Sequence, residues 1–247
     1  MDEQEHKGER IAKVMARAGL CSRREAERWI EDGRVSVNGA VLESAACVVG
    51  PGDEVKVDGK ALAAAEAARL YLYHKPAGLV TSHKDERGRK TVFDALPKDL
   101  GRVVSVGRLD LNSEGLLLLT NDGGLARYLE LPSTGWSRRY RVRVLGDVDE
   151  GRLKDLRGGI TVDGVRYKSI KAELERNKDA ANQWISVTLH EGKNREIRKV
   201  MAALGLQVNR LIRTGYGPFE LGKMKRGDVQ QIEDKVLRAQ VAGYFKS

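Results

Sequence analysis

The sequence predicts an α+β protein with two domains. Helical spacing followed by a hairpin signal marks a small α-then-β domain over residues 10–59. Residues 60–69 are alanine-rich and read as a linker, and short strands mixed with a few helices follow over residues 70–243. A length of 247 residues suffices for one sizeable core and one accessory domain. Residues 1–9 are expected to be a flexible tail.

The charge balance favours a polyanionic partner. Lys and Arg total 44 against 35 Asp and Glu, which gives a net charge of +9. Such a balance favours nucleic acid, because phosphate contacts release condensed counterions. The alternative is a basic protein whose charge serves solubility alone.

Several function classes find no support in the composition. No apolar run approaches the ~18 residues of a membrane span, and the charged N-terminus lacks a secretory signal, so we expect a cytoplasmic protein. Two cysteines are too few for a disulfide framework. The four scattered histidines show no metal-ligand spacing, and no metal is expected.

Two helices are predicted at the start of the first domain. Apolar residues recur at helical spacing from Ile11 to Ala18, and Gly19 can end that helix. The sequence Ser-Arg-Arg-Glu over residues 22–25 has the form of a capping box, which opens a second helix that runs to Gly33. Two short strands, residues 35–37 and 41–42, then flank Asn-Gly, which predicts a hairpin.

Basic side chains lie on these helices away from their apolar sides, notably Arg17, Arg23 and Arg24. They could meet RNA phosphates, although neighbouring glutamates would also suit an ordinary solvated face. Residues 10–59 resemble the small RNA-binding module first known from ribosomal protein S-four, including the Gly-Leu-Cys-Ser-Arg-Arg-Glu-Ala turn over residues 19–26. The resemblance implies RNA binding without chemistry.

The second domain contains a polar loop followed by a buried strand. Gly107-Arg108-Leu109-Asp110 opens the loop, and the strand over residues 116–119 is all leucine before an Asn-Asp-Gly turn. An aspartate in such a loop usually bonds its own backbone. The local pattern therefore favours a turn role for Asp110.

A second segment, residues 138–144, alternates with the period of a strand. Tyr140 and two valines share one face, where the tyrosine can pack at the edge of the core and still present its ring to a base. Arginines occupy the other face and are either solvated or turned toward phosphate. We favour phosphate, because like charges on one face repel each other without anions. They are Arg139, Arg141 and Arg143.

A third segment, residues 191–201, predicts a helix that Asn194 could cap. Arg195 points away from its apolar stripe, toward solvent or RNA. Arg198 lies on the flank of the stripe, where a half-buried guanidinium usually has a carboxylate partner.

These segments occur in the order seen in one enzyme family. Together with Tyr-His-Lys-Pro-Ala-Gly at 73–78, Thr-Val-Phe at 91–93 and Gly-Pro-Phe at 217–219, they resemble the rRNA pseudouridine synthases of the RsuA/RluB branch. The resemblance covers residues 10–230. The Tyr-His-Lys-Pro opening and residues 191–198 are most similar to members that modify large-subunit rRNA.

The resemblance implies a role for each matched residue. Asp110 would be the catalytic aspartate, Tyr140 would stack on the target base, and Arg198 would pair with the aspartate. Leu211 would pack against the site, and Arg108 would help fill the gap left by the extruded nucleotide. The remaining RNA contacts are expected at basic residues of the second domain: Lys75, Arg139, Arg141, Lys193 and Arg195.

The implied function is the isomerisation of one uridine to pseudouridine in ribosomal RNA of the large subunit, free or in an assembling subunit. The reaction detaches uracil, turns it and rejoins it through carbon 5, so no cofactor is required. A mixed, mainly antiparallel sheet flanked by helices is expected, in a monomer. The alternatives are a small-subunit enzyme or a non-catalytic ribosome-assembly factor. A hydrolase using Asp110 and Glu114 has no independent support.

Overall fold

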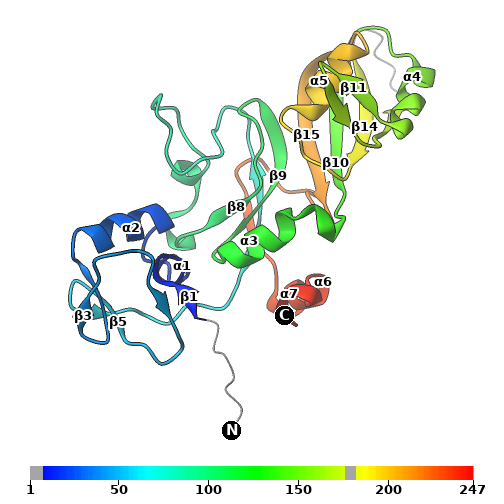
Figure 1. The fold of residues 1–247 in the computed structure, drawn as a ribbon. Coiled ribbons are helices and arrows are strands. Elements are labelled where there is room, and N and C mark those ends of the chain that lie inside the picture. Colours follow the sequence, from blue (N-terminus) through cyan, green and yellow to red (C-terminus); the bar gives the residue numbers. More distant parts are fainter. Residues whose placement is uncertain (1–7, 176–181, 247) are drawn as a thin grey trace. The chain divides into compact units, whose positions relative to one another are not determined.

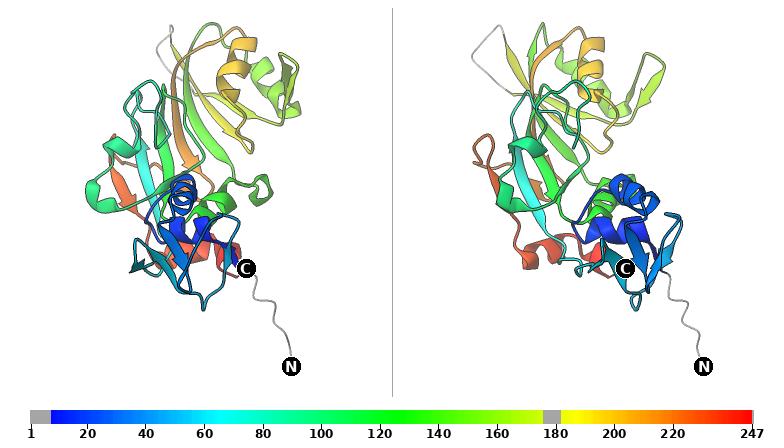
Figure 2. Two further views of the ribbon diagram at one scale, coloured as in Figure 1. Left: turned by 60° about the vertical axis from the view of Figure 1, so that its left-hand side comes forward. Right: turned by 90° about the vertical axis from the view of Figure 1, so that its left-hand side faces the viewer.

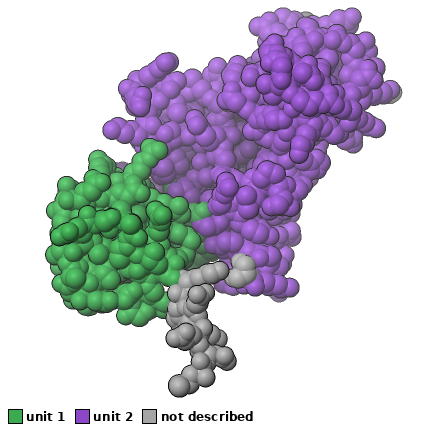
Figure 3. All heavy atoms as spheres, viewed as in Figure 1, with its two compact units in different colours: residues 1–68, 99–103, 121–123 green, residues 69–98, 104–120, 124–247 purple. Residues whose placement is uncertain are grey.

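The computed structural model describes residues 8–175 and 182–246. The chain divides into two compact units (Figure 3). The N-terminal unit comprises Met1–Ala68 with the short segments Asp99–Val103 and Asn121–Gly123, and the large unit comprises the remainder. Each is described by itself below.

The N-terminal unit is built of two helices and short antiparallel strands (Figure 1). Ile11, Met15, Ala26 and Ile30 are fully buried between the helices and the strands. One sheet has the order β3-β2-β5-β6, and β1 pairs with β4. The elements are β1 (Glu9–Arg10), α1 (Ile11–Arg17), α2 (Arg23–Glu31), β2 (Val35–Val37), β3 (Ala40–Val41), β4 (Val48–Val49), β5 (Val55–Val57) and β6 (Lys60–Ala61).

The capping box and the hairpin turn are both present. The Ser22 hydroxyl accepts a hydrogen bond from the N–H of Glu25 at 3.2 Å, and the Glu25 carboxylate accepts one from the N–H of Ser22 at 2.7 Å. Asn38 and Gly39 both have positive φ, as the tight turn between β2 and β3 requires. The local sequence signals therefore agree with the elements observed.

Two expected boundaries differ from the structure. Glu9 belongs to β1 and pairs with Val49, so it is not part of a tail; residues 1–7 lie outside the described chain. Lys60–Ala61 pairs with β5 as strand β6, so irregular backbone begins only at Leu62. Pairing between strands, which composition alone does not reveal, extends the first domain at both ends.

The large unit is organised around a nine-stranded sheet. Its strand order is β13-β14-β10-β15-β9-β7-β17, with β16 added to β15 and β8 added to β9. Among the described strand pairs of this sheet, β15 and β9 are parallel and the others antiparallel. The strands are β7 (Leu70–Lys75), β8 (Val104–Val106), β9 (Ser113–Thr120), β10 (Arg138–Leu145), β13 (Lys171–Glu175), β14 (Gln183–Leu189), β15 (Gln207–Tyr216), β16 (Phe219–Glu220) and β17 (Val229–Gln231).

Close approach between β9 and β15 depends on Gly115. This residue has a φ of +103°, and a Cβ built on it would collide with the backbone of Arg213. All eight residues of β9 are buried, which agrees with the apolar run in the sequence. Glycine therefore lets the two central strands pair where any side chain would keep them apart.

Short helices and a small hairpin complete the large unit, as two further views of the ribbon show (Figure 2). Helix α5 packs on β15, where Ile197, Val200 and Met201 join the core beside Val142 and Val144 of β10. The mixed, mainly antiparallel sheet with flanking helices confirms the predicted α+β class. The elements are α3 (Gly123–Glu130), α4 (Glu150–Asp155), β11 (Ile160–Val162), β12 (Val165–Tyr167), α5 (Glu196–Ala203), α6 (Asp234–Gln240) and α7 (Ala242–Phe245).

Within residues 8–175 and 182–246, every helix is too short or too polar to cross a membrane.

Candidate active site

The loop over residues 107–112 joins β8 to β9 and carries Asp110. Its start is held by Glu130, whose carboxylate accepts a hydrogen bond from the N–H of Gly107 at 2.6 Å. Its middle is held by Thr81, whose hydroxyl donates to the carbonyl of Leu109 at 2.8 Å. Side chains from other segments thus fix the backbone that leads to the aspartate.

Lys75 binds the same loop through its backbone carbonyls. Its side chain is fully buried, and its ammonium group donates hydrogen bonds to the carbonyls of Ser113 at 2.9 Å and Asp110 at 3.2 Å, among others. Burial lowers the pKa of this ammonium to about 8, although the charges of Asp110 and Glu114 oppose that shift. The sequence predicts that Lys75 contacts RNA. The structure corrects this prediction, because the ammonium is buried and not accessible to a phosphate.

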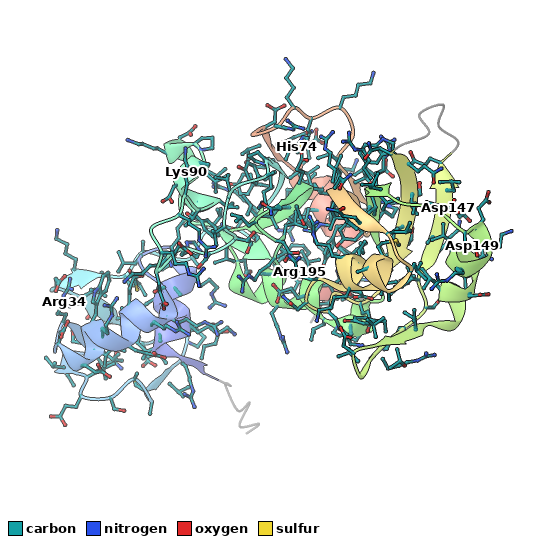
Figure 4. The ribbon with its side chains drawn as sticks, turned by 90° about the horizontal axis from the view of Figure 1, so that it is seen from above. Arg34, His74, Lys90, Asp147, Asp149 and Arg195 are labelled. Carbon is teal, nitrogen blue, oxygen red and sulfur yellow. The ribbon has the colours of Figure 1, made fainter. Side chains whose placement is uncertain are left out.

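Asp110 lies beside Arg195 rather than paired with Arg198. Nη1 of Arg195 is 3.7 Å from Oδ2 of Asp110, and the aspartate side chain keeps 30% of its exposure. Figure 4 shows Arg195 in the loop that precedes α5. This guanidinium supplies a positive charge next to the carboxylate at the open side of the site.

Arg198 binds backbone carbonyls and not the carboxylate of Asp110. Its guanidinium donates hydrogen bonds to the carbonyls of Asn112 at 2.9 Å and Val208 at 3.3 Å. Burial and the charge of Arg195 lower the pKa of the Arg198 guanidinium, although the nearby charge of Asp110 opposes this shift. The predicted ion pair is therefore replaced by contacts to backbone, which tie the end of the Asp110 loop to α5 and β15.

The predicted helix cap at Asn194 is also corrected. Helix α5 begins at Glu196, and its N-cap position is Arg195 in the left-handed conformation, with a φ of 53° and no side-chain cap. In place of a cap, the carboxylate of Glu196 accepts a hydrogen bond from the N–H of Lys193 at 3.0 Å. The turn produced in this way directs Arg195 at Asp110.

Tyr140, Leu211 and Asp110 line one open pocket. The pocket has a cavity volume of about 140 Å³ and opens to solvent. Tyr140 is half-buried on β10, and Leu211, which is buried, comes from the adjacent strand β15. The structure therefore brings together three of the residues that the sequence singled out.

A second hollow adjoins this pocket and shares Asp110 and Arg108 with it. Arg108 is exposed between the two. Further basic residues line the second hollow: Arg89, Lys193 and Arg195. The space around Asp110 is thus continuous with a basic surface able to receive phosphates.

Sequence reasoning missed Arg213 and Glu196, which also line the pocket. Arg213 is 2% exposed, and its Nε donates to the carbonyl of Leu116 at 2.7 Å. It is two residues from Leu211 on β15, so period-two alternation could have placed it on the pocket face. Glu196 directly precedes the apolar stripe of α5, so the sequence pattern does not reveal that its side chain lines the pocket.

Two of the arginines singled out on β10 are held by neighbouring groups. Arg139 donates to the carbonyl of Gly217 at 3.0 Å, and Arg141 forms an ion pair with Glu175 at 2.6 Å and stacks on Trp184. Arg139 and Arg141 thus have partners within the protein, whereas Nε of Arg143 is buried without a hydrogen-bond partner among the described residues. The alternation itself is confirmed, since Val142 and Val144 are fully buried on the face of Tyr140.

Glu114 lies outside the pocket, although it is four residues from Asp110. Its carboxylate is bound by Arg210 at 2.8 Å and Arg226 at 2.9 Å. Both of its oxygens are therefore engaged, and the two carboxylates do not form a hydrolytic pair.

In the N-terminal unit, Arg23 and Arg24 are exposed at the first turn of α2. Arg17 is exposed on α1 and forms an ion pair with Glu9 at 2.5 Å. Two of the three arginines expected to contact RNA are thus displayed without a described acidic partner.

Two family descriptions match this chain. Residues 69–203 match the family described as RNA pseudouridylate synthase. The chain belongs to the RNA pseudouridine synthase family. Residues 9–60 match the S4 domain, so the RNA pseudouridine synthase unit follows an RNA-binding module, as the resemblance implied.

Individual relatives span nearly all of this chain. An uncharacterized RNA pseudouridine synthase of Rickettsia bellii is 47% identical over 230 residues, which cover 93% of this chain and 99% of the relative. The ribosomal large subunit pseudouridine synthase B of Salmonella typhi is 46% identical over 234 residues, 91% of this chain and 79% of the relative. A crystal structure of a pseudouridylate synthase matches with a TM-score of 0.66 at 26% identity, covering 94% of this chain and 100% of that one.

Proposed function

We propose that this enzyme isomerises one uridine of large-subunit ribosomal RNA to pseudouridine, with Asp110 as the catalytic carboxylate. The observation that carries the proposal is the position of Asp110: it lies on a braced loop in an open pocket, beside Arg195 and Tyr140. The large-subunit target rests on the 46% identity to the Salmonella enzyme, which is named for that substrate.

The residues present suit the reaction. The N1–C1′ bond of the uridine breaks, a C5–C1′ bond forms, and the proton on C5 leaves while N1 gains one. Asp110 is the anion that assists the exchange of bonds at the sugar, and Arg195 provides the adjacent positive charge. Tyr140 stacks on the base, Leu211 packs against it, and Arg108 occupies the gap that the extruded nucleotide leaves. No oxidant, reductant or group donor is consumed.

RNA binding is assigned to both units. Arg23 and Arg24 of the S4 domain meet phosphates, and Arg108, Lys193 and Arg195 surround the extruded nucleotide. One chain contains every residue named here, so the enzyme is proposed to act as a monomer.

The Asp110→Asn variant tests the catalytic assignment. It should form no pseudouridine in bare ribosomal RNA or a stem-loop, and it should bind that RNA as tightly as the wild type. Substantial residual activity would remove Asp110 from this role. A wild-type protein that binds RNA but never forms pseudouridine would support the assembly-factor alternative.

Mapping pseudouridines in ribosomal RNA from cells with and without the gene tests the substrate. Loss of one large-subunit pseudouridine is the expected result. Loss of a small-subunit site instead would reassign the enzyme to the other subunit.

A further inference from the structure

Glu196 is a buried carboxyl group at the pocket wall for which the proposed reaction has no use. Its side chain is 4% exposed in the first turn of α5. One oxygen, Oε2, accepts the N–H of Lys193 at 3.0 Å. The other, Oε1, is buried without a hydrogen-bond partner among the described residues. A buried carboxylate oxygen in this state would be costly, whereas a protonated one could donate.

Glu191 is the group available to accept a hydrogen bond from a protonated Glu196. Both carboxyl groups bind Lys193, Glu191 through its ammonium and Glu196 through its N–H, and each is close enough to shift the pKa of the other. Glu191 is itself anchored as an anion, because its Oε1 accepts the N–H of Lys168 at 2.7 Å and its Oε2 lies 3.0 Å from the ammonium of Lys193. Two carboxylates in contact without a shared proton would repel each other.

The shared proton secures the loop that carries Arg195. Glu196 holds the N–H of Lys193, and the carbonyl of Lys193 accepts the N–H of Glu196 at 3.2 Å. Arg195 lies between them in the left-handed conformation, which is unfavourable for a residue other than glycine and needs support from its surroundings. Its guanidinium then reaches Asp110 at 3.7 Å.

We propose that Glu196 is a positioning residue that acts in its protonated form: by sharing a proton with Glu191, it keeps residues 191–195 in the turn that presents Arg195 to Asp110. The inference rests on the proposed function, because the consequence for catalysis runs through Asp110. It assigns Glu196 no contact with the RNA.

The titration of the pair supports this reading. Burial raises the pKa of Glu196 to about 7, helped by the nearby Glu191 and opposed by the backbone N–H and the ammonium of Lys193. Burial would also raise the pKa of Glu191, but the N–H of Lys168 and the ammonium of Lys193 outweigh it and lower that pKa. Other charged or titratable groups near this loop include Arg195, Tyr167 under Lys193, Arg166, whose carbonyl accepts a hydrogen bond from the ammonium of Lys193, and Arg138 from β10, which donates to the carbonyl of His190.

The sign of the pH effect follows from the raised pKa. The folded protein keeps the Glu196 proton to about pH 7, whereas the unfolded chain loses it near the ordinary value of 4.5. The favourable contribution is thus complete below pH 4.5 and is lost as the pH rises through about 7. Above that pH the two carboxylates repel, and the turn that carries Arg195 loosens.

The test compares Glu196→Gln, Glu196→Ala and the wild type over a pH series from about 6 to about 9. Glutamine keeps an acceptor for Lys193 and a donor for Glu191 but cannot ionise. Wild-type kcat for pseudouridine formation should fall as the pH rises through about 7, and the glutamine variant should lack this fall. Alanine should lose about 10-fold to 100-fold in kcat at every pH, because Arg195 is misplaced. Glu173→Gln, an exposed site on β13, is the control and should follow the wild type.

Hydrogen exchange at the amide of Lys193 gives a second readout that needs no activity. Exchange in the wild type should accelerate above pH 7 relative to the glutamine variant at the same pH. Identical kcat profiles and identical exchange in these two proteins would overturn the inference. If the wild type forms no pseudouridine at any pH, the proposed function fails, and the exchange data alone still decide whether Glu196 holds the loop.

Discussion

The guanidinium of Arg195 lies 3.7 Å from the carboxylate of Asp110, whereas Arg198 bonds the backbone carbonyls of Asn112 and Val208. Both arginines come from one short segment that begins α5, yet the structure gives them different tasks. One provides charge at the open side of the pocket, and the other ties two chain segments together.

Replacement by glutamine should therefore affect catalysis at one arginine and stability at the other. Arg195→Gln should lower kcat for pseudouridine formation by about 10-fold to 100-fold with little change in stability, because a charge beside Asp110 is lost. Arg198→Gln should lower the free energy of unfolding by about 1–3 kcal/mol, because buried carbonyls lose a charged donor. Steady-state kinetics and urea unfolding separate the two effects. A loss of kcat in Arg198→Gln at unchanged stability would restore Arg198 as the functional partner.

Lys75→Met should destabilise the loop of Asp110. The carbonyls of Ser113 and Asp110 would lose their donor in a fully buried place, at a cost of about 1–3 kcal/mol each. Urea unfolding measures the loss, and pseudouridine formation should fall with it because the loop is no longer braced. Lys84→Met, at an exposed site, is the matched control. Unchanged unfolding in Lys75→Met would show that water or other donors replace the ammonium.

Much of the fold is readable in the sequence where local chemistry decides the outcome. The capping box of α2, the Asn38-Gly39 turn and the apolar run of β9 each specify their element within a few residues. Period-two alternation predicts the face of β10 on which Tyr140 lies. These features depend on neighbours along the chain.

The site is less readable because its contacts join distant segments. The spacing of residues 195–198 could not show whether Arg195 or Arg198 reaches Asp110, since the answer depends on the left-handed turn at Arg195. Lys75 looks like a surface lysine beside a proline, and only its meeting with the loop of Asp110 buries it. Glu196 has the sequence context of an ordinary helix residue, although the first turn of α5 buries it against Glu191.

Gly115→Ala should be far more damaging than a glycine replacement in open space. A Cβ at residue 115 meets the backbone of Arg213, which cannot move without parting β9 from β15. We expect a loss of about 3 kcal/mol or more in the free energy of unfolding. Gly88→Ala has a positive φ but no atom within 4 Å of the new Cβ, so it should cost only about 1 kcal/mol. Equal losses in a thermal or urea melt would show that backbone strain alone accounts for residue 115.

Replacing Arg23 and Arg24 by glutamine should weaken RNA binding without altering kcat at saturating RNA. Log affinity falls with log salt concentration, and each lost phosphate contact should reduce the magnitude of this negative slope by about 0.7–0.9. Filter binding at several salt concentrations measures the slope. Arg157→Gln, an exposed arginine on the large unit, is the control. A double variant with the wild-type slope would show that α2 faces something other than phosphate.

The parallel pairing of β9 with β15 has a consequence for the order in which the enzyme acquires its parts. Leu211 pairs with Ser113, so the pocket closes a loop of nearly a hundred residues and has high contact order. During synthesis it cannot assemble until the chain has emerged past β15. The helices and hairpins of residues 9–61 join near neighbours and can form long before that. A nascent chain would therefore acquire its RNA-binding surface before it acquires a pocket.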